Sequence, residues 1–193
     1  MARPPSISTQ QILEAARAEF LARGLARAST RAIARRAGVS EGSIFNRFPT
    51  KSILFQAAMD EAQPPAFTLS TFVGQGDVRK NLIRITVESV HFLGQLLPRL
   101  MLRWSERTPT GAARMRNRPR EILRALTQFF AAEKARGRVA GDPEIAARIF
   151  MGSVWNYCFL QTVTGDRSLS VPAFARRLVA GLWRGIAPGS TRR

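Results

Sequence analysis

The sequence has few of the residues on which most catalytic and metal sites depend. It contains one cysteine, Cys158, and one histidine, His91, so no intrachain disulfide can form and a Cys/His site would need both residues together. No metal-ligand spacing, phosphate-binding loop or nucleophile motif is present. These absences argue against an enzyme and give no reason to expect a cofactor. Cys158 stands in an apolar segment, which favours a small core residue over a reactive thiol.

Features of membrane and exported proteins are also missing. No run of eighteen apolar residues occurs, and residues 1–6 do not resemble a signal sequence. The sequence therefore predicts a cytoplasmic protein with no membrane segment.

Acidic residues are scarce as well, with 13 Asp and Glu against 30 Lys and Arg and a formal net charge of +17. Residues 1–60 carry nine basic and four acidic side chains, and residues 61–193 carry 21 and nine. A basic protein attracts polyanions. However, most of the surplus of basic over acidic residues lies in residues 61–193. An arginine-rich surface in contact with solvent would explain that surplus equally well. Charge alone is therefore not evidence of specific DNA binding.

A helix-turn-helix pattern lies between residues 29 and 51. Ser29 and Ser40 can each cap the start of a helix, and Gly38 can end the first helix because glycine adopts a left-handed conformation at low cost. Two short helices joined by such a turn place the second helix in the major groove of DNA. An ordinary helical hairpin would share the short pattern Ala-x-x-x-Gly. The inward positions are Ile33, Ala34, Ala37, Ile44 and Phe48.

The full pattern resembles the TetR family of bacterial repressors over roughly the first third of the chain. The matching positions are Ile33, Ala34, Ala37, Gly38, Val39, Ser40, Gly42, Ser43, Ile44, Phe45, Phe48, Pro49 and Lys51, together with Ile12, Leu13, Ala15, Ala16, Phe20 and Gly24 in the helix ahead.

The resemblance implies a set of DNA-contacting residues. Thr30 would hold a phosphate, and Arg31 would touch phosphate or base. The others are Ser40, Glu41, Gly42 and Ser43, which would face the major groove, and Asn46, Arg47 and Lys51, which would contact bases or backbone. Phe45 stands at a position where many family members have a tyrosine, and the hydroxyl of that tyrosine often bonds a phosphate. Phenylalanine has no hydroxyl. We therefore expect Phe45 only to pack.

The chain is long enough for a small DNA reader and a second core. We predict an all-α protein of about nine helices. Residues 1–50 would form the helix-turn-helix DNA-binding domain, and residues 51–193 a ligand-binding and dimerisation domain. A connector is expected at 64–76 and a loop at 108–119. The expected helices span residues 8–24, 30–37, 41–48, 51–63, 77–96, 98–105, 119–135, 143–164 and 171–186.

Two surfaces of the second domain are also predicted, a ligand pocket and a dimer interface. His91 belongs to a polar stripe on the helix of residues 77–96, which either faces solvent or faces a ligand cavity. Aromatic residues of this domain could line a pocket or belong to the core. The candidate ligand contacts are His91, Phe92, Trp104, Phe129, Trp155 and Tyr157. The resemblance implies a dimer through the last two helices, with the candidates Phe150, Phe174, Leu178 and Leu182.

These features predict a ligand-responsive transcriptional regulator, usually a repressor, that binds a near-palindromic operator as a homodimer. The expected small-molecule effector is neutral or anionic, because residues 61–193 carry a net charge of +12 and Glu88 is the only acid inside the long apolar helices apart from their ends. A DNA-binding regulator controlled by a protein partner, without a small ligand, is the alternative.

Overall fold

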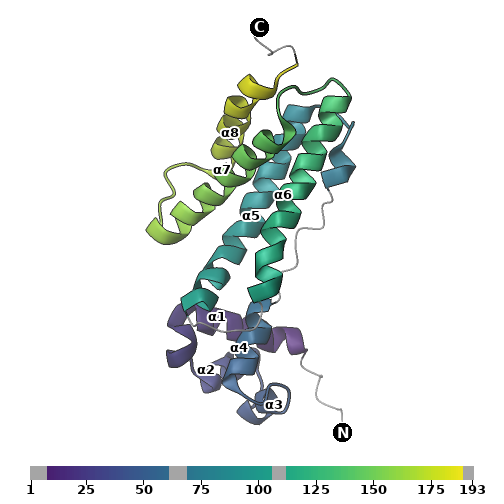
Figure 1. The fold of residues 1–193 in the computed structure, drawn as a ribbon. Helices are drawn as coiled ribbons and strands as arrows, with labels where there is room; N and C mark the ends of the chain where they lie inside the picture. The colour runs from purple at the N-terminus through teal and green to yellow at the C-terminus, as the bar shows by residue number, and fades with distance from the viewer. Residues whose placement is uncertain (1–7, 61–68, 106–111, 189–193) are drawn as a thin grey trace. The chain divides into compact units, whose positions relative to one another are not determined.

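The computed structural model describes residues 8–60, 69–105 and 112–188, and within them it contains helices and no strand. This confirms the predicted all-α class. Eight α-helices are present there, rather than about nine (Figure 1). They are α1 (Thr9–Arg27), α2 (Thr30–Ala37), α3 (Glu41–Phe45), α4 (Lys51–Asp60), α5 (Val78–Ser105), α6 (Ala112–Ala135), α7 (Pro143–Thr164) and α8 (Val171–Ile186), with a 3₁₀ helix, η1 (Leu69–Phe72), before α5.

By packing, the chain forms two compact units, each with its own core. The described parts of residues 1–63 and 98–111 form the first unit, and those of residues 64–97 and 112–193 form the second. Helix α4 packs on α1 in the first unit, whereas the predicted domain boundary between residues 50 and 51 lies just before α4. That boundary divides the chain by function, and it stays a prediction.

The first unit is built around α1, which packs against α2 and α4. Phe20 of α1 meets Phe55 of α4 edge to face, with ring centroids 5.1 Å apart. A capping box starts α1, since the Ser8 hydroxyl accepts from Gln11 N and Gln11 Oε1 accepts from Ser8 N. Gly24 has φ 72° and ψ 171°, so the regular part of α1 ends there, as predicted. A further short turn follows a kink and reaches Arg27, and Ala28 N donates to the Gly24 carbonyl oxygen.

The second unit has a core rich in phenylalanine. Phe130 lies edge to face with both Phe129 and Phe150, at centroid distances of 5.4 and 6.5 Å. Cys158 of α7 is 2% exposed, and its Sγ lies 3.8 Å from the carbonyl oxygen of Val90 in α5. Burial raises the pKa of this thiol to about 11. The prediction that Cys158 is a core residue is confirmed.

Two proline positions were interpreted wrongly from the sequence. The predicted short helix at 98–105 is the last part of α5, which passes through Pro98. The predicted loop at 108–119 is partly helical, because α6 begins at Ala112 and passes through Pro119; residues 106–111 lie outside the described part of the chain. A proline removes one hydrogen bond from a helix, and packing of the residues on both sides can outweigh that loss.

A buried carboxylate holds the segment that precedes α5. Glu133 of α6 is fully buried; its Oε1 accepts a hydrogen bond from Gly74 N at 2.8 Å, and its Oε2 lies 2.9 Å from Arg138 Nε. Nη2 of Arg138 also donates to the carbonyl oxygens of Gln75 and Gly76, at 3.1 and 2.7 Å. We call these contacts the Glu133 clamp. They fix residues 74–76 to the C-terminal end of α6.

Candidate nucleic-acid interface

Local signals set the limits of the two short helices. The Ser29 hydroxyl accepts from Ala32 N and starts α2, and the Ser40 hydroxyl accepts from Ser43 N and starts α3. Gly38 ends α2 in the left-handed conformation, with φ 69°. The resulting turn lets α2 and α3 pack together, as a helix-turn-helix requires.

All nine residues predicted to contact DNA are accessible to solvent. Ile44 and Phe48 fill the inner side, at 0% and 8% exposure, and so turn the polar residues of α3 outward. Arg31, Ser40, Gly42, Asn46 and Arg47 are exposed, and Thr30, Glu41, Ser43 and Lys51 are half-buried. Their contacts with DNA stay a prediction.

Several of these residues are bonded to one another or to the backbone. Thr30 Oγ1 donates to Glu41 Oε1 at 2.7 Å, which links the start of α2 to the start of α3. The Ser40 and Ser43 hydroxyl oxygens lie 2.9 Å apart. Lys51 Nζ donates to the carbonyl oxygen of Ala26 at 3.0 Å. An ammonium group has three donors, so Lys51 keeps two for a phosphate.

Phe45 does not pack as expected, because 41% of it is exposed. Ile44 takes the inward position, and the next residue of a helix points about 100° away from it. The surface of α3 therefore carries an exposed aromatic ring beside the polar residues.

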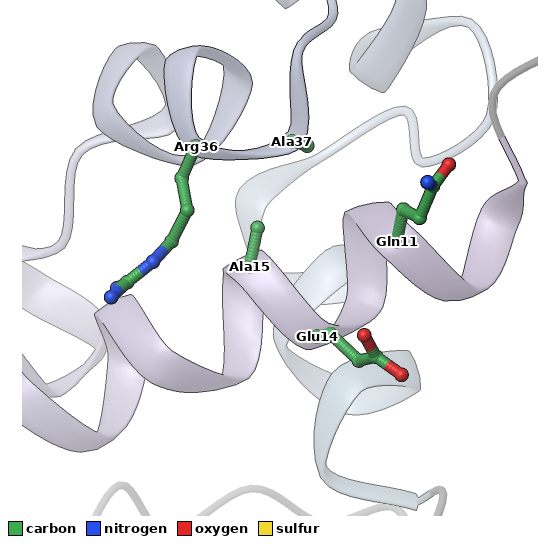
Figure 2. A pocket seen from close by; sticks show the side chains of 5 residues that line it. All are labelled: Gln11, Glu14, Ala15, Arg36 and Ala37. Carbon is green, nitrogen blue, oxygen red and sulfur yellow. The ribbon is translucent and has the colours of Figure 1, made fainter.

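A hollow of about 290 Å³ lies between α1 and α2. It is lined by Gln11, Glu14, Ala15, Arg36 and Ala37, and the two alanines leave it open because their side chains are short (Figure 2). The Arg36 and Glu14 side chains do not point toward one another. None of the nine predicted DNA contacts lines this hollow.

The six candidate ligand contacts have different surroundings. His91 is exposed, which agrees with a polar stripe that faces solvent, and Phe92 is half-buried. Trp104 and Trp155 are 57% and 37% exposed. Phe129 is a core residue, and Tyr157 stacks on Phe174 with ring centroids 4.0 Å apart.

A second hollow, of about 250 Å³, lies on α6 and the start of α7. This hollow lies in the second unit. None of the six candidate ligand contacts lines it. Its lining residues are Arg120, Leu123, Arg124, Thr127, Gln128 and Glu144.

Two of the four candidate dimer residues are buried within a single copy, and the dimer contacts stay a prediction. Phe150 and Leu182 are only 2% and 7% exposed within a single copy, so they belong to its own core and offer little surface to a partner. Phe174 and Leu178 are half-buried. The sequence showed that α7 is apolar nearly all round, but not which side faces outward. The exposed large apolar residues of α7, called the α7 apolar face below, are Ile145, Ile149, Trp155, Phe159, Leu160 and Val163.

Comparisons with known families match both parts of the chain. Residues 12–58 match the family described as bacterial regulatory proteins of the tetR family. Residues 93–182 match the C-terminal domain of AefR-like transcriptional repressors. No curated protein matches the chain.

Solved structures resemble the chain along nearly its whole length. SmeT, the repressor of the Stenotrophomonas maltophilia multidrug efflux pump SmeDEF, is 21% identical, with a TM-score of 0.66 and 97% of each chain covered. NalD, the secondary repressor of the MexAB-OprM multidrug efflux pump in Pseudomonas aeruginosa, is 24% identical, with a TM-score of 0.63 over 93% of this chain and 95% of that one. At such identities the likeness concerns the fold.

Proposed function

Because the chain belongs to the TetR family of bacterial regulatory proteins, we propose that it is a ligand-responsive repressor that binds a near-palindromic operator as a homodimer. As a family member it is a DNA-binding transcriptional regulator. The observation that carries the proposal is the accessible polar side of α3, which stands beside the start of α2 and is held there by Ile44 and Phe48.

Selection of bound fragments from genomic DNA by the purified full-length protein tests this function. The expected product is one sequence with two inverted half-sites, a helical turn or a multiple of it apart. Enrichment without a shared sequence would contradict the proposal.

The α7 apolar face supports the dimer. Six large apolar residues on one helix, each 37–53% exposed, form an extended surface of the kind that marks an interaction site. Gly152 lies among them and is exposed. A side chain at this position would have no neighbouring atom within 4 Å of its Cβ, so a second backbone could approach closely there. A second copy placed on this surface would present two copies of α3 to the two half-sites.

A small molecule would act by favouring one of two conformations. In one conformation of the dimer the two α3 helices fit both half-sites, and in the other they do not. A small molecule that binds the second conformation more tightly releases the protein from the operator. In the described residues, no helix is long and apolar enough to cross a membrane.

The effector is expected to be neutral or anionic. The described acids within α5 and α6 leave no buried carboxylate free for a cation. Glu88 pairs with Arg84 at 3.0 Å, Glu133 belongs to the clamp, and Glu121 is exposed to solvent. A buried cation would need an unpaired acid or an aromatic cage to offset its lost hydration. A thermal-shift screen should therefore find stabilising compounds among acids and amides. A compound at 100 times its Kd should add about 2.7 kcal/mol of stability.

The screen is best run with matched sets, each containing an aromatic or aliphatic carboxylic acid, its amide and the corresponding amine. The three share a shape and differ in charge. If the amines raise the melting temperature and the acids and amides do not, the expected charge preference is wrong.

The predicted roles of the DNA contacts differ, and single substitutions should separate them. Lys51→Ala should weaken binding to all duplexes and reduce the slope of log K against log salt by about one unit for each copy of the chain. Asn46→Ala or Arg47→Ala should lose about 1–3 kcal/mol of discrimination at one symmetric pair of operator positions. The measurement is the affinity of each variant for single-base operator variants at several salt concentrations.

Arg177→Ala serves as the control, because Arg177 is an exposed arginine on α8 of the second unit. It should change neither the salt slope nor the base preference. The assigned roles would be reversed by the opposite pattern. In that case Asn46→Ala and Arg47→Ala would lower the affinity for all operator variants equally, and Lys51→Ala would change the base preference.

A further inference from the structure

The helix-turn-helix contains a single acid on an otherwise basic segment. Residues 29–51 include Glu41 and five basic side chains, which are Arg31, Arg35, Arg36, Arg47 and Lys51. A carboxylate near DNA phosphates is repelled by their charge. Such a group weakens binding to DNA in general, unless a base edge supplies a donor for it.

Glu41 is held in place by a neighbour from the other helix. Thr30 Oγ1 donates to Glu41 Oε1 at 2.7 Å, and Glu41 is half-buried in the first turn of α3. The bond joins residues that are eleven positions apart. It therefore orients the carboxylate from outside its own helix, and it leaves Oε2 available for another donor.

The same bond limits what Thr30 can do. A hydroxyl group has one proton, and a phosphate oxygen only accepts hydrogen bonds. While Thr30 donates to Glu41, its hydroxyl cannot donate to a phosphate. The phosphate contact that the family resemblance implies for Thr30 thus competes with the bond to Glu41.

The base edges of the major groove differ in what they offer a carboxylate. Guanine presents two acceptors, and thymine presents an acceptor and a methyl group. Adenine presents an amino donor next to the acceptor N7, which repels a carboxylate oxygen placed between them. Cytosine presents the amino donor N4 without an adjacent acceptor, so it is the best partner for an ionised glutamate.

We infer that Glu41, positioned by Thr30, is a specificity-determining residue that selects cytosine at one position of each operator half-site. The inference rests on the proposed function, since it requires sequence-specific binding to duplex DNA. Replacing that cytosine in both half-sites should weaken binding by about 5- to 150-fold per site. Non-specific DNA offers no fixed donor to Glu41, so the carboxylate also lowers binding to unrelated sequences.

The test begins with selection of bound duplexes from a randomised pool by the full-length protein. Each base pair of the selected operator is then changed singly, and affinities are measured for wild type, Glu41→Gln, Glu41→Ala, Thr30→Val and Thr30→Ser. Glu41→Gln keeps the size of the side chain and adds an amide donor, so the preference should change from cytosine to adenine at that position alone. Glu41→Ala should remove the preference and strengthen binding to unrelated DNA.

Thr30 is tested as a positioning residue by the other two variants. Thr30→Val removes the hydroxyl at constant size and should reduce the cytosine preference several-fold, whereas Thr30→Ser keeps the hydroxyl and should retain it. Glu14→Gln is the matched control, because Glu14 is an exposed acid on α1 of the same unit. It should leave the whole base profile unchanged.

Three results would overturn the inference in distinct ways. A wild-type protein without any sequence preference would remove the proposed function together with the inference. A specific wild-type protein whose base profile is unchanged in Glu41→Gln would refute the role of Glu41 alone. If Thr30→Val weakens binding equally to all duplexes and keeps the cytosine preference, Thr30 binds phosphate and does not position Glu41.

Discussion

Ile149→Glu is expected to turn the protein into a monomer and to weaken its binding to a full operator by at least about 100-fold. Ile149 belongs to the α7 apolar face and is 49% exposed. In a dimer formed through this face, the new carboxylate would be buried without a partner, at a cost of several kcal/mol. A monomer can occupy only one half-site, so it loses the gain in effective concentration that the second α3 helix provides.

Sedimentation equilibrium gives the mass, and binding to a full operator and to an isolated half-site gives the affinities. Ile122→Glu is the matched control: it makes the same substitution at an isoleucine of α6 that is 41% exposed. The control should stay dimeric and bind as wild type does. If Ile149→Glu also stays dimeric and binds the full operator tightly, the interface does not include the α7 apolar face.

Glu133→Ala is expected to lower the free energy of unfolding by about 3 kcal/mol and the melting temperature by roughly 6–12 °C. The substitution leaves Gly74 N without its acceptor and Arg138 without its counter-ion. Breaking a buried ion pair at one partner costs more than the pair contributes, because the remaining charge stays poorly solvated. Arg138 is 25% exposed at its side chain, which puts the loss at the lower end of the usual range.

The chain contains an exposed pair for comparison. Glu144 and Arg148 lie 2.7 Å apart on α7, and both side chains are 56% exposed. Glu144→Ala should cost no more than about 1 kcal/mol, since exposed pairs are weak and Glu144 adds a small helix-dipole contribution. Thermal and denaturant unfolding of the two variants gives the contrast. Equal losses would show that burial adds nothing to the Glu133 clamp.

The sequence predicted the elements that local chemistry decides. Ser29, Gly38 and Ser40 each act on atoms within a few positions along the chain, so the limits of α2 and the start of α3 could be predicted closely. Asp142 likewise caps α7 through Glu144 N and Ile145 N. Such signals need no knowledge of the rest of the fold.

Features that depend on distant parts of the chain could not be predicted in the same way. Whether a helix stops at Pro98 or continues depends on the packing that holds the residues on both sides. The bond between Thr30 and Glu41 exists only once the turn has brought two helices together. For α7, apolar on nearly every side, only the finished core shows that Phe150 is inside and Ile149 outside.

Pro98 has a mechanical consequence for α5. The residues of α5 before Pro98 belong to the second unit, and those from Pro98 onward belong to the first. A proline has no N–H, so the carbonyl group of Gly94, one turn earlier, lacks its usual helical donor. Gly94 is exposed, and water can serve that carbonyl instead. A helical turn that lacks this hydrogen bond bends more easily than an intact one, because no bond between Pro98 and Gly94 has to break.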